Sequence, residues 1–245
     1  FAIQKNNILI IEVNPRGSRT IPFVAKSTGV PLVNIATKIM LGKKLKDFNL
    51  PNYFFEYQHV SVKEAVFPFS RFPETSAILG PEMKSTGEVM GIDMNLPKAF
   101  AKSQISSKIN LPKKGNIFLS VKDDDKSKIV KICEIFIKLN FEIFSTIGTF
   151  EFLKGRNIKS TLVKKISQGR PNILDMIISK NISLVINTSK NYVSRNDSLE
   201  LRKYSLNLDI PYYSSIQEAL AVTLSIKEIN SSNLKVKSLQ SYFKK

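Results

Sequence analysis

Short apolar runs alternate with amphipathic stretches through the second half of the chain. The runs are rich in β-branched residues and predict buried strands, whereas the amphipathic stretches carry apolar residues every three or four positions and predict helices. We expect strands at 116–121, 141–146, 149–153 and 184–186, and helices at 127–139, 173–179, 199–207 and 215–229. Strands that alternate with helices are typical of a doubly wound α/β domain with a parallel sheet, which we place at 113–245.

The first half of the chain has a less regular α+β pattern. Residues 1–13 alternate like two strands around Asn6 and Asn7, which predicts a β-hairpin. The continuous apolar run at 8–11 predicts that the second strand of this hairpin is buried. Further along, the pattern predicts helices at 20–27, 32–41 and 96–107, and strands at 61–69 and 80–92. A polar stretch at 106–115 predicts a linker, so the first domain is expected to span 1–107.

Two of these helices carry apolar faces that we expect to lie in a core. At 32–41 the face consists of Leu32, Ile35, Ala36, Ile39 and Met40. At 127–139 the single cysteine, Cys133, falls among apolar residues at helical spacing and is predicted to be a core residue. The only histidine, His59, lies in a polar and aromatic segment and is expected to be structural or exposed.

Composition excludes several classes of protein. Hydrophobic residues make up 42% of the 245 residues, as in a globular chain. No apolar run approaches the roughly 20 residues of a membrane-spanning helix, and no signal-peptide pattern opens the chain. One cysteine and one histidine exclude an internal disulfide and a histidine-rich metal site, which fits a cytoplasmic protein.

The formal net charge of +17 at first favours a nucleic-acid partner. Lysine supplies 30 of the 37 basic residues, and these lysines are scattered rather than gathered in an arm or interleaved with aromatic residues. Isoleucine and asparagine are abundant too, which is what AT-rich coding produces independently of function. We therefore expect no nucleic-acid partner, although the same positive field suits phosphorylated ligands.

Polar and charged side chains that could bind a ligand are concentrated directly after the apolar run at 8–11. Glu12 and Asn14 are two residues apart, so on a strand they would share a side. A carboxylate beside an amide oxygen suits Mg²⁺ or Mn²⁺. Pro15 stops the strand, and Arg16 and Arg19 then offer forked donors that match phosphate oxygens. From the residues alone, the alternative is a solvated strand end followed by a basic turn.

A second polar set follows the strands of the later domain. In doubly wound folds, ligands bind at the carboxyl ends of the strands. A phosphate cradle could form there from hydroxyls, an amide, backbone groups near Gly148 and one or two lysines. Such residues also populate ordinary turns. The candidates are Ser120, Lys126, Thr146, Thr149, Lys165, Asn187, Thr188 and Ser189.

Several segments, spread along nearly the whole chain, have amino-acid sequences that resemble one family. Residues 12–16, 18–20 and 23–32 resemble the end of an ATP-grasp domain of the carbamoyl phosphate synthetase large subunit, and 80–91 is similar to that family as well. Residues from about 113 onward resemble its methylglyoxal-synthase-like regulatory domain. The resemblance implies the end of an ATP-grasp domain followed by a doubly wound regulatory domain, in a C-terminal piece of a longer protein.

This resemblance implies an ATP-dependent ligase that makes carbamoyl phosphate from bicarbonate and glutamine-derived ammonia, for pyrimidine and arginine biosynthesis. The partners would be the rest of the large subunit and a small glutaminase subunit. Glu12 and Asn14 would bind the metal, with Glu12 also at the ATP, and Arg16 and Arg19 would be catalytic in the carbamate-phosphorylating half. The chain alone would be inactive. The alternative is a stand-alone module that senses a nucleoside monophosphate.

The resemblance also implies two effector sites. A nucleoside monophosphate of the UMP or IMP type would bind at Lys126, Thr146, Thr149, Lys165, Asn187, Thr188 and Ser189. Ser189 stands where the family usually has threonine, and Ile147 makes its turn more apolar than is common. An ornithine-like amine would bind at Glu64 and Ser214. Methylglyoxal synthase chemistry is not expected, because no histidine follows position 59.

Overall fold

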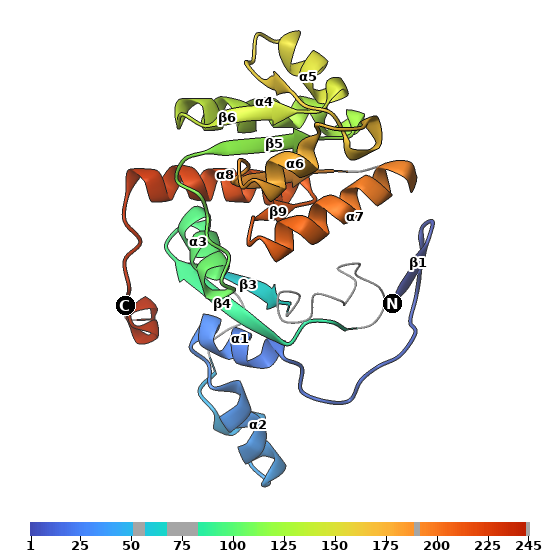
Figure 1. Cartoon of the computed structure of the whole chain (residues 1–245). Helices are drawn as coiled ribbons and strands as arrows, with labels where there is room; N and C mark the ends of the chain where they lie inside the picture. Colours follow the sequence, from blue (N-terminus) through green and yellow to red (C-terminus); the bar gives the residue numbers. More distant parts are fainter. Residues whose placement is uncertain (51–56, 68–82, 189–191, 244–245) are drawn as a thin grey trace. The chain divides into compact units, whose positions relative to one another are not determined.

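The computed structural model describes residues 1–50, 57–67, 83–188 and 192–243 (Figure 1), without the side chains of residues 192–195. The chain forms two compact units. The first comprises Phe1–Phe55 with Leu239–Lys245, and the second comprises Glu56–Ser238. The predicted linker at 106–115 lies inside the second unit, and the division into domains at that point stays a prediction.

The first unit contains the predicted hairpin and two helices. Ala2 pairs with Leu9 and Gln4 with Asn7 in an antiparallel register. Helix α1 ends at Gly29, whose φ of 72° is the left-handed conformation that favours glycine. The elements are β1 (Ala2–Gln4), β2 (Asn7–Leu9), α1 (Thr20–Thr28), α2 (Leu32–Met40), η1 (Leu45–Asp47) and η3 (Leu239–Tyr242).

Two burial predictions for this unit are wrong. Ile8, Ile10 and Ile11 are 68%, 70% and 70% exposed, because β1 is the only strand that pairs with β2 among the described residues and no layer covers the pair. The strand also ends at Leu9, short of the predicted position. On α2, only Ile35 is buried and Met40 is 86% exposed, so its apolar face does not form a core within this unit.

The second unit is built around a parallel sheet with the strand order β7-β6-β5-β8-β9. This agrees with the predicted doubly wound α/β pattern. Its elements are β5 (Asn116–Ser120), α4 (Asp123–Lys138), β6 (Glu142–Ser145), α5 (Ile147–Lys154), β7 (Thr161–Leu162), η2 (Ile166–Gln168), α6 (Ile173–Ile178), β8 (Leu184–Asn187), α7 (Tyr192–Asn207), β9 (Tyr212–Tyr213) and α8 (Ile216–Ser231).

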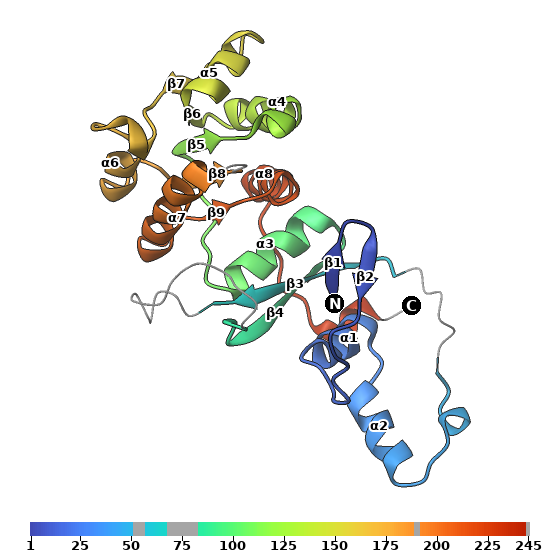
Figure 2. The same cartoon turned by 90° about the vertical axis from the view of Figure 1, so that its right-hand side faces the viewer.

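Helices cover both faces of this sheet (Figure 2). Successive strand residues point to opposite faces, so Ile117 packs with α4 and α8, whereas Phe118 packs with α6 and α7. Both side chains are fully buried, as a parallel sheet requires. Cys133 is fully buried on α4, as predicted, and burial raises the pKa of its thiol to about 12.

The prediction of a strand at 149–153 is wrong, because these residues belong to helix α5. Thr149 and Leu153, four residues apart, are buried, while Glu151 between them is exposed, which is the periodicity of a helix. The aromatic and β-branched residues favoured a strand, but parallel neighbours β6 and β7 need a crossover connection, and α5 supplies it. The two-residue strands β7 and β9 were not predicted.

A smaller layer precedes the sheet. Strand β3 (Val60–Val66) pairs antiparallel with β4 (Gly87–Asp93), and α3 (Leu96–Ser106) packs on both. A Cβ atom at Gly91 would overlap the carbonyl oxygen of Ala99, so the strand and the helix approach closely only because this residue is glycine. The predicted strands at 61–69 and 80–92 are shorter in the structure, and 68–82 lie outside the described residues.

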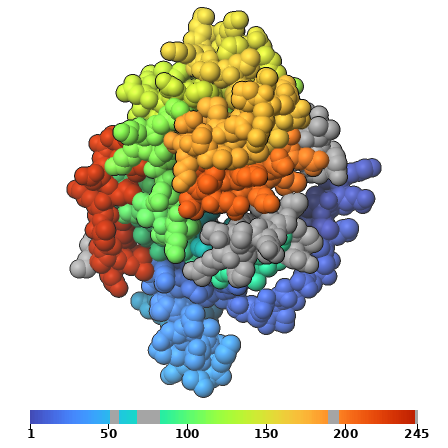
Figure 3. Space-filling view, viewed as in Figure 1, coloured from blue at the N-terminus to red at the C-terminus, as the bar shows by residue number. Residues whose placement is uncertain are grey.

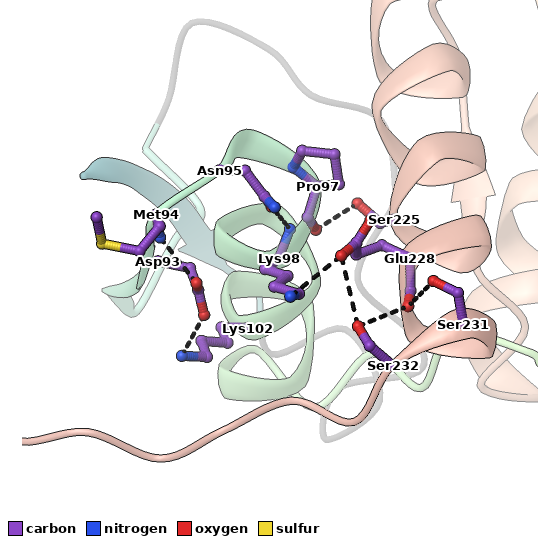
Figure 4. Close-up of polar contacts among 10 residues, drawn as sticks. All are labelled: Asp93, Met94, Asn95, Pro97, Lys98, Lys102, Ser225, Glu228, Ser231 and Ser232. Atoms are coloured by element: carbon purple, nitrogen blue, oxygen red, sulfur yellow. Dashed lines mark hydrogen bonds and ion pairs between the residues drawn. The ribbon is translucent and has the colours of Figure 1, made fainter. Parts of the chain in front are cut away.

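Helix α3 is fastened to α8 by polar contacts (Figure 4). Ser225 Oγ donates a hydrogen bond of 2.8 Å to the Pro97 carbonyl oxygen, and Lys98 Nζ lies 3.1 Å from Glu228 Oε1. The segment after α3 also lies beside the segment after α8 (Figure 3), where Leu111 and Leu234 line a cavity of about 270 Å³. Segments far apart in sequence therefore fold as one body in this unit.

Candidate functional site

A cavity of about 250 Å³ lies at the carboxyl ends of β5, β6 and β8. From the central strand β5 the chain proceeds to β6 and β7 on one side, and then returns to β8 and β9 on the other. Ligands of doubly wound folds bind where the strand order reverses in this way. The cavity therefore occupies the position that the topology favours for a ligand.

The structure brings together six of the seven residues predicted for the nucleotide site. They line the same cavity although they come from α4, the β6–α5 junction, the segment before η2, and the end of β8. The seventh, Ser189, lies outside the described residues. The six are Lys126, Thr146, Thr149, Lys165, Asn187 and Thr188.

Three buried threonines hold the strand ends in place. Thr149 Oγ1 accepts a hydrogen bond of 3.1 Å from the Val121 amide, and Thr188 Oγ1 accepts one of 3.0 Å from the Lys122 amide. Thr146 Oγ1 donates to Ser120 Oγ at 3.2 Å. These hydroxyls link the end of β5 to the start of α5 on one side and to the end of β8 on the other, so hydrogen bonds between segments distant in sequence fix the wall of the cavity.

Three lysines line the cavity, Lys122, Lys126 and Lys165, together with the carboxylates of Asp123 and Asp197. Lys126 Nζ forms an ion pair of 2.7 Å with Asp123 Oδ1, and it would lie 3.4 Å from a Cβ atom added at Gly148. Gly148 stands in the first turn of α5, where backbone amides lack helical partners and favour an anion. The three ammonium groups outnumber the two carboxylates, and with a helix N-terminus they suit an oxyanion such as phosphate.

Sequence reasoning missed four polar residues of the lining, Lys122 and Asp123 after β5 and Asp197 and Ser198 on α7. Asp197 Oδ2 accepts a hydrogen bond of 2.8 Å from Ser167 Oγ, and Ser198 Oγ is 3.0 Å from Asn187 Nδ2. The predicted helix began at 199 and excluded both. The available signal was the apolar residue Leu201 in the predicted helix, because residues three and four positions before it share its helix face.

A second polar cluster contains the predicted amine-site residues Glu64 and Ser214. Gln104 Nε2 donates a hydrogen bond of 3.1 Å to Glu64 Oε2, and the Ser214 amide donates one of 3.2 Å to Glu218 Oε2. Burial raises the pKa of Glu64, the Gln104 hydrogen bond opposes this, and the negative charge of Glu218 adds to it. The structure thus brings both predicted residues into one neighbourhood rich in carboxylates.

The polar set after β2 lies in the first unit and is exposed. Asn14 Nδ2 donates a hydrogen bond of 3.1 Å to Glu12 Oε1, so the two side chains meet although the strand has already ended at Leu9. Half a turn of the amide exchanges its nitrogen and oxygen, which would give two neighbouring oxygen donors of the kind that Mg²⁺ and Mn²⁺ accept. Arg16 and Arg19 follow within five residues.

Two negative findings concern the described residues. Within the ranges that the structure describes, no three histidine, cysteine, aspartate or glutamate side chains gather as a metal cluster. In the same part of the chain, no helix has the length and apolar character needed to span a membrane. A cation bound at Glu12 and Asn14 would therefore keep several ligands from water or from a bound phosphate.

Comparison with known families gives two matches along the chain. The family described as "Carbamoyl-phosphate synthase L chain, ATP binding domain" matches residues 1–48. The family described as "MGS-like domain" matches residues 128–214. The two matches agree with the predicted order of an ATP-grasp end followed by a methylglyoxal-synthase-like domain.

Curated relatives are similar along almost the whole chain. The "Carbamoyl phosphate synthase large chain, C-terminal section" of Aquifex aeolicus is 44% identical over 99% of this chain and 49% of its own length. The large chain of Methanobrevibacter smithii is 47% identical over 98% of this chain and 22% of its own length. That of Myxococcus xanthus is 45% identical over 99% and 22%. The chain thus spans about half of the first relative and about a fifth of the others.

Proposed function

Because the chain belongs to the family of the carbamoyl phosphate synthase large chain and corresponds to the C-terminal part of its members, we propose that it is part of an ATP-dependent ligase. The complete enzyme would make carbamoyl phosphate from bicarbonate and glutamine-derived ammonia, for pyrimidine and arginine biosynthesis. The rest of the large subunit and a small glutaminase subunit would be its partners in the cytoplasm. The 1–107 and 113–245 segments would be its catalytic and regulatory parts.

The regulatory part would bind a nucleoside monophosphate of the UMP or IMP type. The observation that carries this proposal is the cavity that gathers Lys126, Lys165 and the first turn of α5 at the switch point of the sheet. The phosphate would lie near Lys126 and Gly148, because an ammonium group and unpaired helix amides converge there. Asn187 and Thr188 would line the opposite side of the bound ligand.

Calorimetric titration of the chain with UMP and IMP tests this proposal. Lys126→Ala removes a charge-assisted hydrogen bond of about 1.5–3 kcal/mol, so affinity should fall roughly 10- to 100-fold. Lys128→Ala is the matched control, since Lys128 lies on the same helix, pairs with Asp125 and is not part of the cavity lining. Absence of binding, or an equal loss in both variants, would contradict the nucleotide assignment.

The catalytic part would act in phosphorylating carbamate. Glu12 and Asn14 would hold Mg²⁺ or Mn²⁺, which when bound neutralises charge on the phosphates of ATP. Arg16 and Arg19 would bind the transferring phosphoryl oxygens and stabilise the charge that develops on them. The exposure of all four residues supports a role that needs a substrate or another part of the protein to complete the site.

Replacement of Glu12 tests the catalytic assignment in the full-length protein. Glu12→Gln should abolish carbamate-dependent ATP turnover, because the amide cannot neutralise a divalent cation. Glu142→Gln, at an exposed position on β6, controls for loss of a carboxylate. Normal turnover in the Glu12 variant would exclude this residue as a metal ligand.

Glu64 and Ser214 would form an amine effector site, because a carboxylate suits the ammonium group of an ornithine-like ligand. The cluster of Glu64 and Glu218 supports this proposal. The alternative function, a stand-alone nucleotide sensor, predicts a native polypeptide of 27.7 kDa. An immunoblot of the source cells that detects a band several times heavier would favour the ligase.

A further inference from the structure

The short strand β9 lies between the two polar clusters. Its residues Tyr212 and Tyr213 point to opposite faces of the sheet, as neighbouring strand residues do. Tyr212 packs with the residues under α6 and α7, and Tyr213 belongs to the core under α4 and α8. Pairing with Val185 and Ile186 holds both tyrosines beside β8. One dipeptide therefore faces two separate environments.

Tyr212 is tied to the wall of the cavity. Its hydroxyl accepts a hydrogen bond of 3.0 Å from Asn187 Nδ2 and donates one of 3.4 Å to the Ser198 carbonyl oxygen. Asn187 and Ser198 both line the cavity. Asn187 Nδ2 also donates to Ser198 Oγ, so both of its amide protons are used. A ligand that accepts a hydrogen bond from Asn187 Nδ2 must therefore displace either the Tyr212 hydroxyl or Ser198 Oγ from it.

Tyr213 is tied to Glu64 through one buried amide. Its hydroxyl donates a hydrogen bond of 2.9 Å to Gln104 Oε1, and Gln104 Nε2 donates to Glu64 Oε2 at 3.1 Å. Gln104 is 1% exposed. If Tyr213 moved alone, the buried amide would lose its partner, which is costly in a low-dielectric interior. The chain of bonds therefore tends to shift as a unit.

We propose that β9 couples occupancy of the cavity to the Glu64 carboxylate, with Tyr212 and Tyr213 as the positioning residues. The two tyrosines share one peptide unit, so a displacement that suits one hydroxyl moves the other. The coupling is reciprocal, because a ligand at Glu64 must change affinity in the cavity by the same factor. The identity of the cavity ligand rests on the proposed function, but the coupling itself does not.

NMR of the side-chain amide of Gln104 in the full chain tests the coupling without a ligand. Asn187→Ala removes the bond to Tyr212, and it should shift the Gln104 resonance. In a Tyr213→Phe background the same replacement should leave the Gln104 resonance in place, because the connecting hydroxyl is gone. Tyr204→Phe, a half-buried tyrosine on α7 outside the cavity lining, is the matched background and should preserve the shift.

The same resonance is then followed during titration with UMP. It should move in step with saturation in the parent chain and stay fixed in Tyr213→Phe. If UMP does not bind, the nucleotide assignment fails while the Asn187→Ala comparison still decides the coupling. A Gln104 resonance that ignores Asn187→Ala, or that responds equally in the Tyr213→Phe and Tyr204→Phe backgrounds, overturns the coupling.

Discussion

Two apolar runs of nearly the same composition differ in burial in this chain. Residues 184–186 of β8 are fully buried, whereas 8–11 at the hairpin are 54% to 70% exposed. Each run is followed by polar residues that we assign to a ligand site. The difference is that β8 has strands on both sides and helices on both faces, while β2 has one partner strand among the described residues. An apolar run predicts a strand, but its burial depends on neighbours far along the chain.

The largest expected effect comes from truncating one residue in each run. Ile186→Ala leaves a cavity in a closely packed sheet and should lower the free energy of unfolding by about 2–5 kcal/mol. Ile10→Ala should change it by less than about 0.5 kcal/mol, because Ile10 is 70% exposed. Urea denaturation followed by circular dichroism measures both. Equal losses in the two variants would show that the hairpin run is covered in solution.

A pair of glycines on β4 sharpens the comparison within one strand. Gly91→Ala places a methyl group against the backbone of α3 and should lower the free energy of unfolding by roughly 1–3 kcal/mol. Gly87→Ala is the control, because nothing lies within 4 Å of the added atom. The same denaturation measurement applies. A neutral Gly91→Ala would mean that the layer of β3 and β4 separates easily from α3.

The smallest expected effect concerns Glu64, a carboxylate whose exposure lies between that of buried Ile186 and that of exposed Ile10. Burial raises the pKa of Glu64 above its ordinary value of 4.5, so the folded chain retains a proton that the unfolded chain has released. The stability that this proton contributes is present below pH 4.5 and is lost as pH rises through the raised native pKa. Stability relative to the parent should therefore increase with pH in Glu64→Gln.

Denaturation between pH 4 and 7 measures this trend, with exposed Glu12→Gln as the control for loss of one negative charge. A constant difference between Glu64→Gln and the parent over that range would contradict the raised pKa. The comparison of Ile10 with Ile186 then extends to a carboxylate. Burial by distant elements changes the ionisation of Glu64, just as it decides the exposure of the two isoleucines.

Local signals predicted most of the second unit. The period of apolar residues located β5, β6, β8 and α8, and seven of the eight candidates from strand-end chemistry, Ser120 included, line one cavity. The same reasoning failed at 149–153, where the need for a crossover outweighed strand propensity. It also missed Asp197, because the helix predicted at 199–207 began after the two turns of α7 that precede it. The elements and site residues that depend on local sequence spacing were predictable, whereas the features that depend on partners far along the chain were not.

The bond between Ser225 and the Pro97 carbonyl spans 128 residues, and that between Tyr213 and Gln104 spans 109. During synthesis, α3 emerges from the ribosome long before α8 exists to cover it. The nascent chain must therefore carry α3 without this neighbour for several seconds or more, at about 5–20 residues per second. The docking of α3 on α8 is consequently a late event in the maturation of this unit, whereas its docking on β3 and β4 can take place as soon as α3 has emerged.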